Sequence, residues 1–257
     1  MPTVKHILDY LYTLAPAQYK MDWDNVGLMC GHSDREVTKV LLALDASLAV
    51  AEEAAQLGCE LVAVHHPLIF TSTQSATDET LTGQRLLCYL ESGLAVISMH
   101  TNLDCAPGGV NDVLADRLGL QAVQTVQDGE GANLLRIGTA EKQPLQQFLP
   151  FVKQQLACEG LRYADGGREV QRVAVGGGAC GDMFAQAAEL GCDTLVTGDV
   201  KYNQFIDAKA LGLNLIDAGH FETENPVCDV LDALLRNAFP DLEVIRSRVH
   251  TDYAQFL

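Results

Sequence analysis

The chain contains an internal repeat. Residues 54–59 (AAQLGC) recur 133 positions later as residues 187–192 (AAELGC), and the same interval relates residues 39–42 to residues 172–175. Further along, GLAVI at 93–97 resembles GLNLI at 212–216. Self-similarity at a fixed interval is the signature of a duplicated unit. The repeat therefore predicts two halves that each run strand, helix, strand, helix, strand.

Alternating apolar strands and helices of this length predict the α/β class with largely parallel sheets. We expect two similar, duplicated α/β lobes. The first lobe covers residues 1–125 and is completed by the C-terminal segment of about 220–257, and the second covers 126–219. Ligands of parallel sheets bind beyond the carboxyl ends of the strands. Polar residues with metal-ligand chemistry follow the predicted strands, so we expect a metal site at these strand ends, between the lobes.

Composition narrows the functional classes. The formal net charge is −17, which repels phosphate backbones and disfavours general nucleic-acid binding, although it suits the concentration of divalent cations. No apolar run approaches the roughly 20 residues that cross a bilayer, and the N-terminus does not resemble a signal peptide. The eight cysteines contain no CxxC pair. We therefore expect a cytoplasmic protein with reduced cysteines and no membrane association.

A histidine pair follows the first half's second strand. His65 and His66 precede Pro67, which restricts the residue before it to extended conformations. Successive side chains of a regular strand point to opposite faces, so both histidines reach one region only if the chain leaves the sheet at His65. Two neighbouring ions are then the natural partners. Alternatively, the pair simply ends a strand.

In each half, one histidine and one acidic residue follow the third strand. His100 precedes Asp104, and His220 precedes Glu224, at the same spacing. Residues four apart share one face of a helix, and a carboxylate there can bridge two cations. His100 could be a ligand, a proton carrier or a partner of a ligand. Nitrogen and oxygen ligands without thiolate suit Zn, Mn, Fe, Co or Ni without selecting among them.

A glycine motif offers a competing interpretation. Gly176, Gly178 and Gly181 follow a predicted strand and open a helix, with Asp199 about 20 residues later, as in a dinucleotide fingerprint. The equivalent segment of the first half has no glycines, so the motif is not intrinsic to the fold. The preferred interpretation is a glycine loop that lies close to the metal site or binds an anion.

Together these residues resemble the GTP cyclohydrolase 1 type 2 homolog family, also called the NIF-three-like family. The matching stretches span nearly the whole chain: DWDNVGL at 22–28, VHHPLIF at 64–70, HTNLD at 100–104, GDVKY at 198–202 and GHFETE at 219–224. The resemblance implies two similar α/β lobes and toroidal homohexamers with interior sites. It also implies a dinuclear centre in which His65 and Asp104 hold one ion, His66 and His220 hold the other, and Glu224 bridges both. Many relatives carry His where this chain has Asn203.

The pattern and the resemblance together predict a metal-dependent hydrolase with two divalent ions per chain, acting on a nucleotide-like or other small substrate. Two close ions lower the pKa of a bridging water and polarise the electrophile. His100, Asp199 and Lys201 are the candidate proton carriers. The alternative is a non-catalytic metal-binding or scaffold protein. The two differ in the coordination sphere, since only catalysis requires exchangeable water positions.

Overall fold

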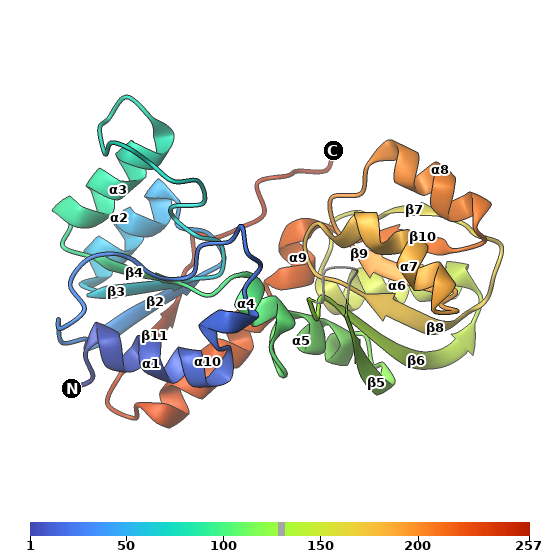
Figure 1. Ribbon diagram of the computed structural model, residues 1–257, viewed down its shortest axis with the longest axis horizontal. Helices are drawn as coiled ribbons and strands as arrows, with labels where there is room; N and C mark the ends of the chain where they lie inside the picture. Colours follow the sequence, from blue (N-terminus) through green and yellow to red (C-terminus); the bar gives the residue numbers. More distant parts are fainter. Residues whose placement is uncertain (128–131) are drawn as a thin grey trace. The chain divides into compact units, whose positions relative to one another are not determined.

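The computed structural model describes residues 1–127 and 132–257. The chain divides into two compact units, each of which contains one β-sheet (Figure 1). The first unit comprises residues 1–106 and 228–251, and the second comprises residues 107–227 and 252–257. The expected α/β class with two duplicated lobes is confirmed, because each unit packs helices against a sheet that contains three adjacent parallel strands. The sheet of the first unit is largely parallel, as predicted, whereas that of the second is mixed, because β5, β6 and β7 add to it through antiparallel pairs.

The first unit has a five-stranded sheet in the order β1-β4-β3-β2-β11. All neighbouring strands are parallel except β1, which pairs antiparallel with β4. The strands are β1 (Gly27–Cys30), β2 (Lys39–Ala43), β3 (Leu61–Val64), β4 (Ala95–Ser98) and β11 (Glu243–Arg246). The helices are α1 (Val4–Leu14), η1 (Ala17–Tyr19), α2 (Leu48–Leu57), α3 (Leu81–Glu91), α4 (Thr101–Cys105) and α10 (Val227–Ala238).

The second unit has a six-stranded sheet in the order β5-β6-β8-β9-β10-β7, in which β8, β9 and β10 are parallel. The strands are β5 (Gln121–Val126), β6 (Leu135–Gln143), β7 (Arg162–Ala164), β8 (Val170–Val175), β9 (Thr194–Thr197) and β10 (Asn214–Asp217). The helices are α5 (Val110–Arg117), α6 (Leu145–Leu156), η2 (Cys180–Met183), α7 (Phe184–Glu189), α8 (Tyr202–Ala210) and α9 (His220–Glu224).

The repeat corresponds to matching elements. β2-α2-β3-α3-β4 of the first unit matches β8-α7-β9-α8-β10 of the second, and in both the three strands are parallel and adjacent in chain order. Strands β3 and β4 are buried at every position, as is typical of a parallel sheet covered on both faces. Each repeat therefore supplies three parallel strands whose carboxyl ends lie along one edge of its sheet.

Within each unit, strands and helices that are far apart in the sequence pack together. Strand β11 adds to the first sheet beside β2, and residues 228–251 therefore belong to the first unit. Strand β5 pairs with β6, and Leu114 of α5 and Leu118, which follows that helix, join a core cluster with α6 and β8. Residues 107–125 therefore pack in the second unit, and residues 220–227 and 252–257 also belong to it, although the sequence had grouped all three segments with the first lobe.

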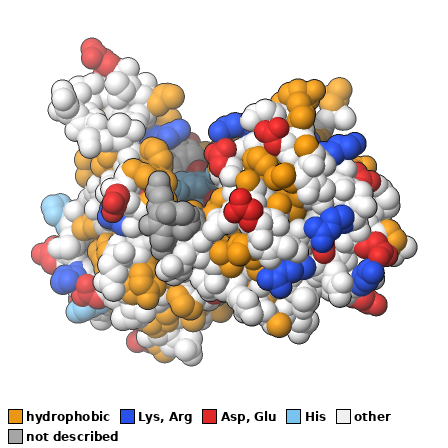
Figure 2. All heavy atoms as spheres, turned by 45° about the vertical axis from the view of Figure 1, so that its right-hand side comes forward, with side chains coloured by type: hydrophobic (Ala, Val, Ile, Leu, Met, Phe, Trp, Pro, Cys, Tyr) orange, Lys and Arg blue, Asp and Glu red, His pale blue; other side chains and the backbone are white. Residues whose placement is uncertain are grey.

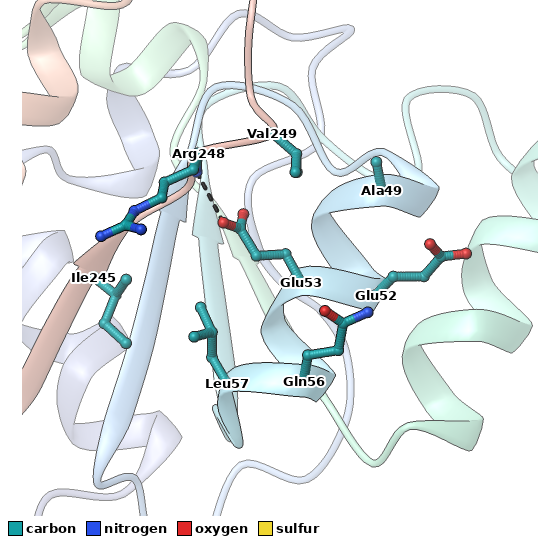
Figure 3. Close-up of a pocket in the computed structure, with 8 residues that line it drawn as sticks. All are labelled: Ala49, Glu52, Glu53, Gln56, Leu57, Ile245, Arg248 and Val249. Carbon is teal, nitrogen blue, oxygen red and sulfur yellow. Dashed lines mark hydrogen bonds between the residues drawn. The ribbon is translucent and has the colours of Figure 1, made fainter.

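The segment after β11 runs along helix α2 in the first unit (Figure 3). Oε1 of Glu53 on α2 accepts a hydrogen bond from the Arg248 amide at 2.9 Å, and Oε2 accepts one from the Ser247 hydroxyl at 2.5 Å. A pocket of about 410 Å³ lies beside these contacts, and none of the candidate site residues lines it. The contacts fix the C-terminal segment against the helix that follows β2.

The surface carries charges of both signs. On the face shown in Figure 2, Lys and Arg side chains are interspersed with Asp and Glu instead of gathering into one basic patch. This distribution is unlike the basic stripe of a nucleic-acid-binding domain. Among residues 1–127 and 132–257, no helix has the length and hydrophobicity needed to span a bilayer.

Candidate metal centre

The histidine pair lies where β3 ends. The backbone amides of His65 and His66 both donate to the carbonyl of Leu44, at 3.2 and 2.8 Å, and the Ser98 hydroxyl donates to the carbonyl of His65 at 2.7 Å. The chain thus leaves the strand at His65, and the alternation of a regular strand no longer separates the two rings. Their centroids lie 4.9 Å apart.

His100 follows the neighbouring strand β4 and joins this pair. Its ring centroid lies 5.1 Å from that of His65 and 5.5 Å from that of His66. Each of the three histidines offers a ring nitrogen within 4.8 Å of the other two. Asp104, one helical turn further on α4, places Oδ1 3.6 Å from Nε2 of His65, and both side chains are buried. The first unit therefore collects three imidazoles and one carboxylate at adjacent strand ends.

Each of these histidines is held through the same ring atom. Nδ1 of His65 lies 2.8 Å from the Met99 carbonyl oxygen, Nδ1 of His66 lies 2.9 Å from Asp45 Oδ1, and Nδ1 of His100 lies 2.7 Å from Asp24 Oδ1. Carbonyl and carboxylate oxygens only accept hydrogen bonds, so Nδ1 is the donor and Nε2 carries the lone pair of the neutral ring. This tautomer follows from the hydrogen-bond network, and it is the one that binds a metal through Nε2.

Asp24 is the fully enclosed anchor of His100. Its Oδ2 atom accepts from the amide and the hydroxyl of Thr101, at 3.0 and 2.5 Å, while Oδ1 faces His100. Burial by itself raises the pKa of this carboxyl, but the hydrogen bonds with His100 and Thr101 outweigh burial and lower the pKa below its ordinary value. Asp24 is therefore a carboxylate at neutral pH.

The second unit presents a matching set after β10. Nδ1 of His220 lies 2.7 Å from Asp199 Oδ2, and Nε2 lies 3.1 Å from Oε2 of Glu224 on the next turn of α9. Asp199 follows β9 with a positive φ of 51°, a conformation that Asp tolerates better than most residues. The loop after β9 thus orients the histidine that follows β10.

The glycine loop packs against these two ligands. A Cβ atom on Gly178, whose φ is +61°, would lie 2.1 Å from Glu224 Oε1 and 3.1 Å from His220 Nε2. The amides of Gly177 and Gly178 already donate to Asn111 Oδ1 and Thr223 Oγ1, at 2.7 and 3.0 Å. These amides are thus engaged within the protein instead of facing a pyrophosphate, which argues against the dinucleotide interpretation. The glycines allow the backbone to approach Glu224.

Lys201 and Glu222 lie beside this set. The Lys201 ammonium is 3.4 Å from Asp182 Oδ2 on η2. Glu222, buried on α9, lines a pocket of about 280 Å³ together with Asp199 and His220. Burial raises the pKa of Glu222, and the neighbouring Asp252 and Asp217 add to this effect. The second unit therefore has a small acidic pocket next to its histidine.

The donor set fits a divalent metal ion. Imidazole Nε2 atoms and carboxylate oxygens are the ligands of Zn and of the redox-active first-row metals. A histidine ligand usually donates its other ring N–H to a carboxylate or a carbonyl, and His65, His66 and His220 all do so. The sequence did not single out Asp24 or Asp45 as partners. Two features could have pointed to them. Asp24 lies in the DWDNVGL stretch, and Asp45 comes shortly after the end of β2.

Known proteins share this fold and length. The model of the Duf34/NIF3 (NGG1p interacting factor 3) family matches residues 2–253. A Clostridium perfringens protein named GTP cyclohydrolase 1 type 2 homolog is 34% identical, with 98% of each chain covered. A Helicobacter pylori protein named GTP cyclohydrolase 1 type 2 is 30% identical, with 92% of this chain and 93% of that protein covered. The solved structure of a Staphylococcus aureus hypothetical protein is 28% identical, with a TM-score of 0.91 and 99% of each chain covered. The resemblance noted in the motifs thus extends over the whole sequence and fold, and this chain belongs to the Duf34/NIF3 family.

Proposed function

We propose that this chain binds two divalent metal ions and hydrolyses a small substrate. The proposed ligands are His65, His66 and Asp104 of the first unit and His220 and Glu224 of the second. When bound, such ions lower the pKa of a coordinated water and polarise the substrate's electrophile. Zn, Mn, Fe, Co and Ni all suit these nitrogen and oxygen donors.

One observation carries this proposal. The three histidines among the proposed ligands each have Nδ1 at 2.7–2.9 Å from a carbonyl or carboxylate oxygen. A buried or half-buried imidazole that only filled space would need no such uniform orientation. Orientation of Nε2 by an oxygen partner is what a metal-ligating histidine requires.

His100 is the proposed proton carrier. Its Nδ1 is bonded to Asp24, so Nε2 can accept a proton, and the Asp24 carboxylate then stabilises the imidazolium. In catalytic triads, a buried acid orients a histidine base in the same way. Asp199 and Lys201 are proposed as secondary carriers. Asp199 is the better placed of these two because it touches His220, whereas Lys201 faces Asp182.

The substrate class rests on similarity. Relatives at 30–34% identity carry names that refer to GTP cyclohydrolase 1 type 2, which supports a nucleotide-like substrate opened by hydrolysis. We also propose a cytoplasmic homo-oligomer, with the toroidal hexamer that the family resemblance implies. Light scattering coupled to size exclusion tests the assembly.

Metal content per chain, measured by mass spectrometry on protein purified without a chelator or a histidine tag, tests the function. We expect about two ions per chain in the wild type and their loss in Glu224→Gln. Glu189→Gln, an exposed acid on α7, is the matched control and should keep its metal. A hydrolysis screen of nucleotides, cyclic amides and phosphoesters follows with the metal-loaded protein. Two bound ions without turnover would support the alternative of a non-catalytic metal-binding protein.

A further inference from the structure

Two large aromatic side chains of the first unit remain exposed beside the histidine cluster. Trp23 is 56% exposed and Phe70 is 57% exposed. Their ring centroids lie 5.7 Å from each other, and 6.0 Å and 6.1 Å from the centroid of His100. His100 in turn touches His65 and His66. The two rings therefore continue the candidate centre outward to the surface.

The loops that carry these rings are fixed by hydrogen bonds. The Asn25 side-chain amide donates to the Ile69 carbonyl at 2.8 Å, which links the Trp23 loop to the Phe70 loop. The Met21 amide donates to the Thr101 hydroxyl at 2.9 Å, and Lys20 Nζ donates to the Asp24 carbonyl at 2.8 Å. Trp23 thus stays exposed on an anchored loop, although burying a side chain of this size is normally favourable.

The surroundings indicate what covers the rings. Exposed polar residues flank both side chains, with Asp22 and Asn25 beside Trp23 and Thr71 after Phe70. Two half-exposed rings within a polar surface form a patch much smaller than the roughly 800 Å² of total surface that each partner buries in a stable protein interface. They match the face of a single conjugated ring instead. Aromatic side chains bind such rings by offset stacking or edge contacts.

We propose that Trp23 and Phe70 form a stacking subsite for a flat, conjugated ring of the small substrate, next to His100. This inference rests on the proposed function and deepens it, because it states which part of the substrate is recognised and where. The class is a planar heteroaromatic ring, and a puckered, saturated ring with the same polar groups should bind more weakly. Each stacked base in other proteins contributes about 1–3 kcal/mol, or roughly a 5- to 140-fold change in affinity.

Trp23 is the only tryptophan of the chain, so its fluorescence reports on this subsite alone. The test titrates zinc-loaded protein with uridine and with 5,6-dihydrouridine, whose base lacks the planar ring. We expect saturable quenching that requires about 5-fold or more dihydrouridine to reach half-saturation. Phe70→Leu should weaken uridine binding by about 5-fold or more. Tyr202→Leu, which removes an exposed ring on α8, should leave binding unchanged.

Equal binding of the two nucleosides, or a Phe70→Leu variant that binds uridine like the wild type, would overturn the subsite. The subsite would also be overturned if Trp23 fluorescence changed with the protein concentration and not with the nucleoside concentration, because the rings would then face a second copy of the chain. The metal content of each sample separates this outcome from failure of the proposed function. If the protein holds two ions per chain but binds uridine and dihydrouridine equally, the subsite alone is refuted. If it holds no metal, the metal centre is refuted.

Discussion

The Nε2 atom of His250 accepts a hydrogen bond from the backbone amide of Leu44 at 2.8 Å. The carbonyl of the same Leu44 accepts from the amides of His65 and His66. A residue near the C-terminus thus supports the turn that orients the histidine pair, 206 positions apart from Leu44 in the chain. The Ser247 hydroxyl accepts from the His250 amide at 3.1 Å and holds the segment in place.

The pKa of His250 predicts how the stability of the protein depends on pH. Burial lowers its pKa from 6.5 to about 4, with smaller and opposing effects from Asp45, Arg246, His66 and Glu53. Between these values the unfolded chain binds a proton that the native protein does not, so stability falls as the pH drops from 6.5 toward 4. The contribution is on the order of 3 kcal/mol. We expect chelator-treated His250→Gln to lose this part of the pH dependence of unfolding by urea.

The same position separates a hydrogen-bond role from simple packing. At pH 7, Gln keeps an acceptor for the Leu44 amide, whereas His250→Leu leaves that amide buried without a partner. We expect His250→Leu to lose roughly 1–3 kcal/mol of unfolding free energy and His250→Gln to lose less. Equal losses in the two variants would show that the ring contributes packing and not the hydrogen bond.

Asp24→Asn tests the anchor of His100. Asn retains an acceptor for His100 but replaces the second carboxylate oxygen, which accepts from the Thr101 amide and hydroxyl. We expect a loss of roughly 1–3 kcal/mol in unfolding free energy at neutral pH. Because the native pKa of Asp24 lies below 3.8, this stabilisation is present above pH 3.8 and is lost as the pH falls below it. The exposed neighbour provides the control, and Asp22→Asn should change stability by less than about 0.5 kcal/mol.

Gly178→Ala tests the close approach of the glycine loop to the ligands. The new Cβ atom would overlap Glu224 Oε1, whereas a Cβ on Gly191 meets no atom within 4 Å. Both positions have positive φ, so both alanine variants lose roughly 1 kcal/mol of stability through backbone strain. Only Gly178→Ala should also lose bound metal, measured by mass spectrometry. Retention of two ions in this variant would show that Glu224 is not a ligand.

Asp199→Asn tests the orientation of His220. Asn tolerates the positive φ of this position, so the fold should persist, but a neutral amide supports the imidazole less strongly. Loss of such an outer partner typically weakens metal binding by about 10- to 100-fold. Cobalt titration followed by visible absorption measures the affinity. Asp182→Asn is the control because its carboxylate contacts Lys201 and Gln204, and an equal effect in that variant would contradict the proposed role.

Helix boundaries show one limit of the sequence. The sequence from Glu222 to about Asn237 has the pattern of one continuous helix, but α9 ends at Glu224 and α10 begins at Val227. Pro226 explains the break, since it has no N–H and restricts the residue before it. The apolar period continues after the proline, so the pattern alone did not show that the helix carrying His220 and Glu224 ends before it.

The sequence by itself determined the repeat, the α/β class and the placement of polar residues after strands, because strand and helix periodicities are local properties of the chain. Only the tertiary structure decided the partners of those residues. Asp24 reaches His100 across 76 positions, and His250 reaches Leu44 across 206. Asp24 precedes β1, whose antiparallel pairing puts its amino end beside the carboxyl end of β4. His250 follows β11, whose parallel pairing puts its carboxyl end beside that of β2. No local pattern encodes these pairings, so the sequence identified the candidate ligands and the fold supplied the groups that orient them.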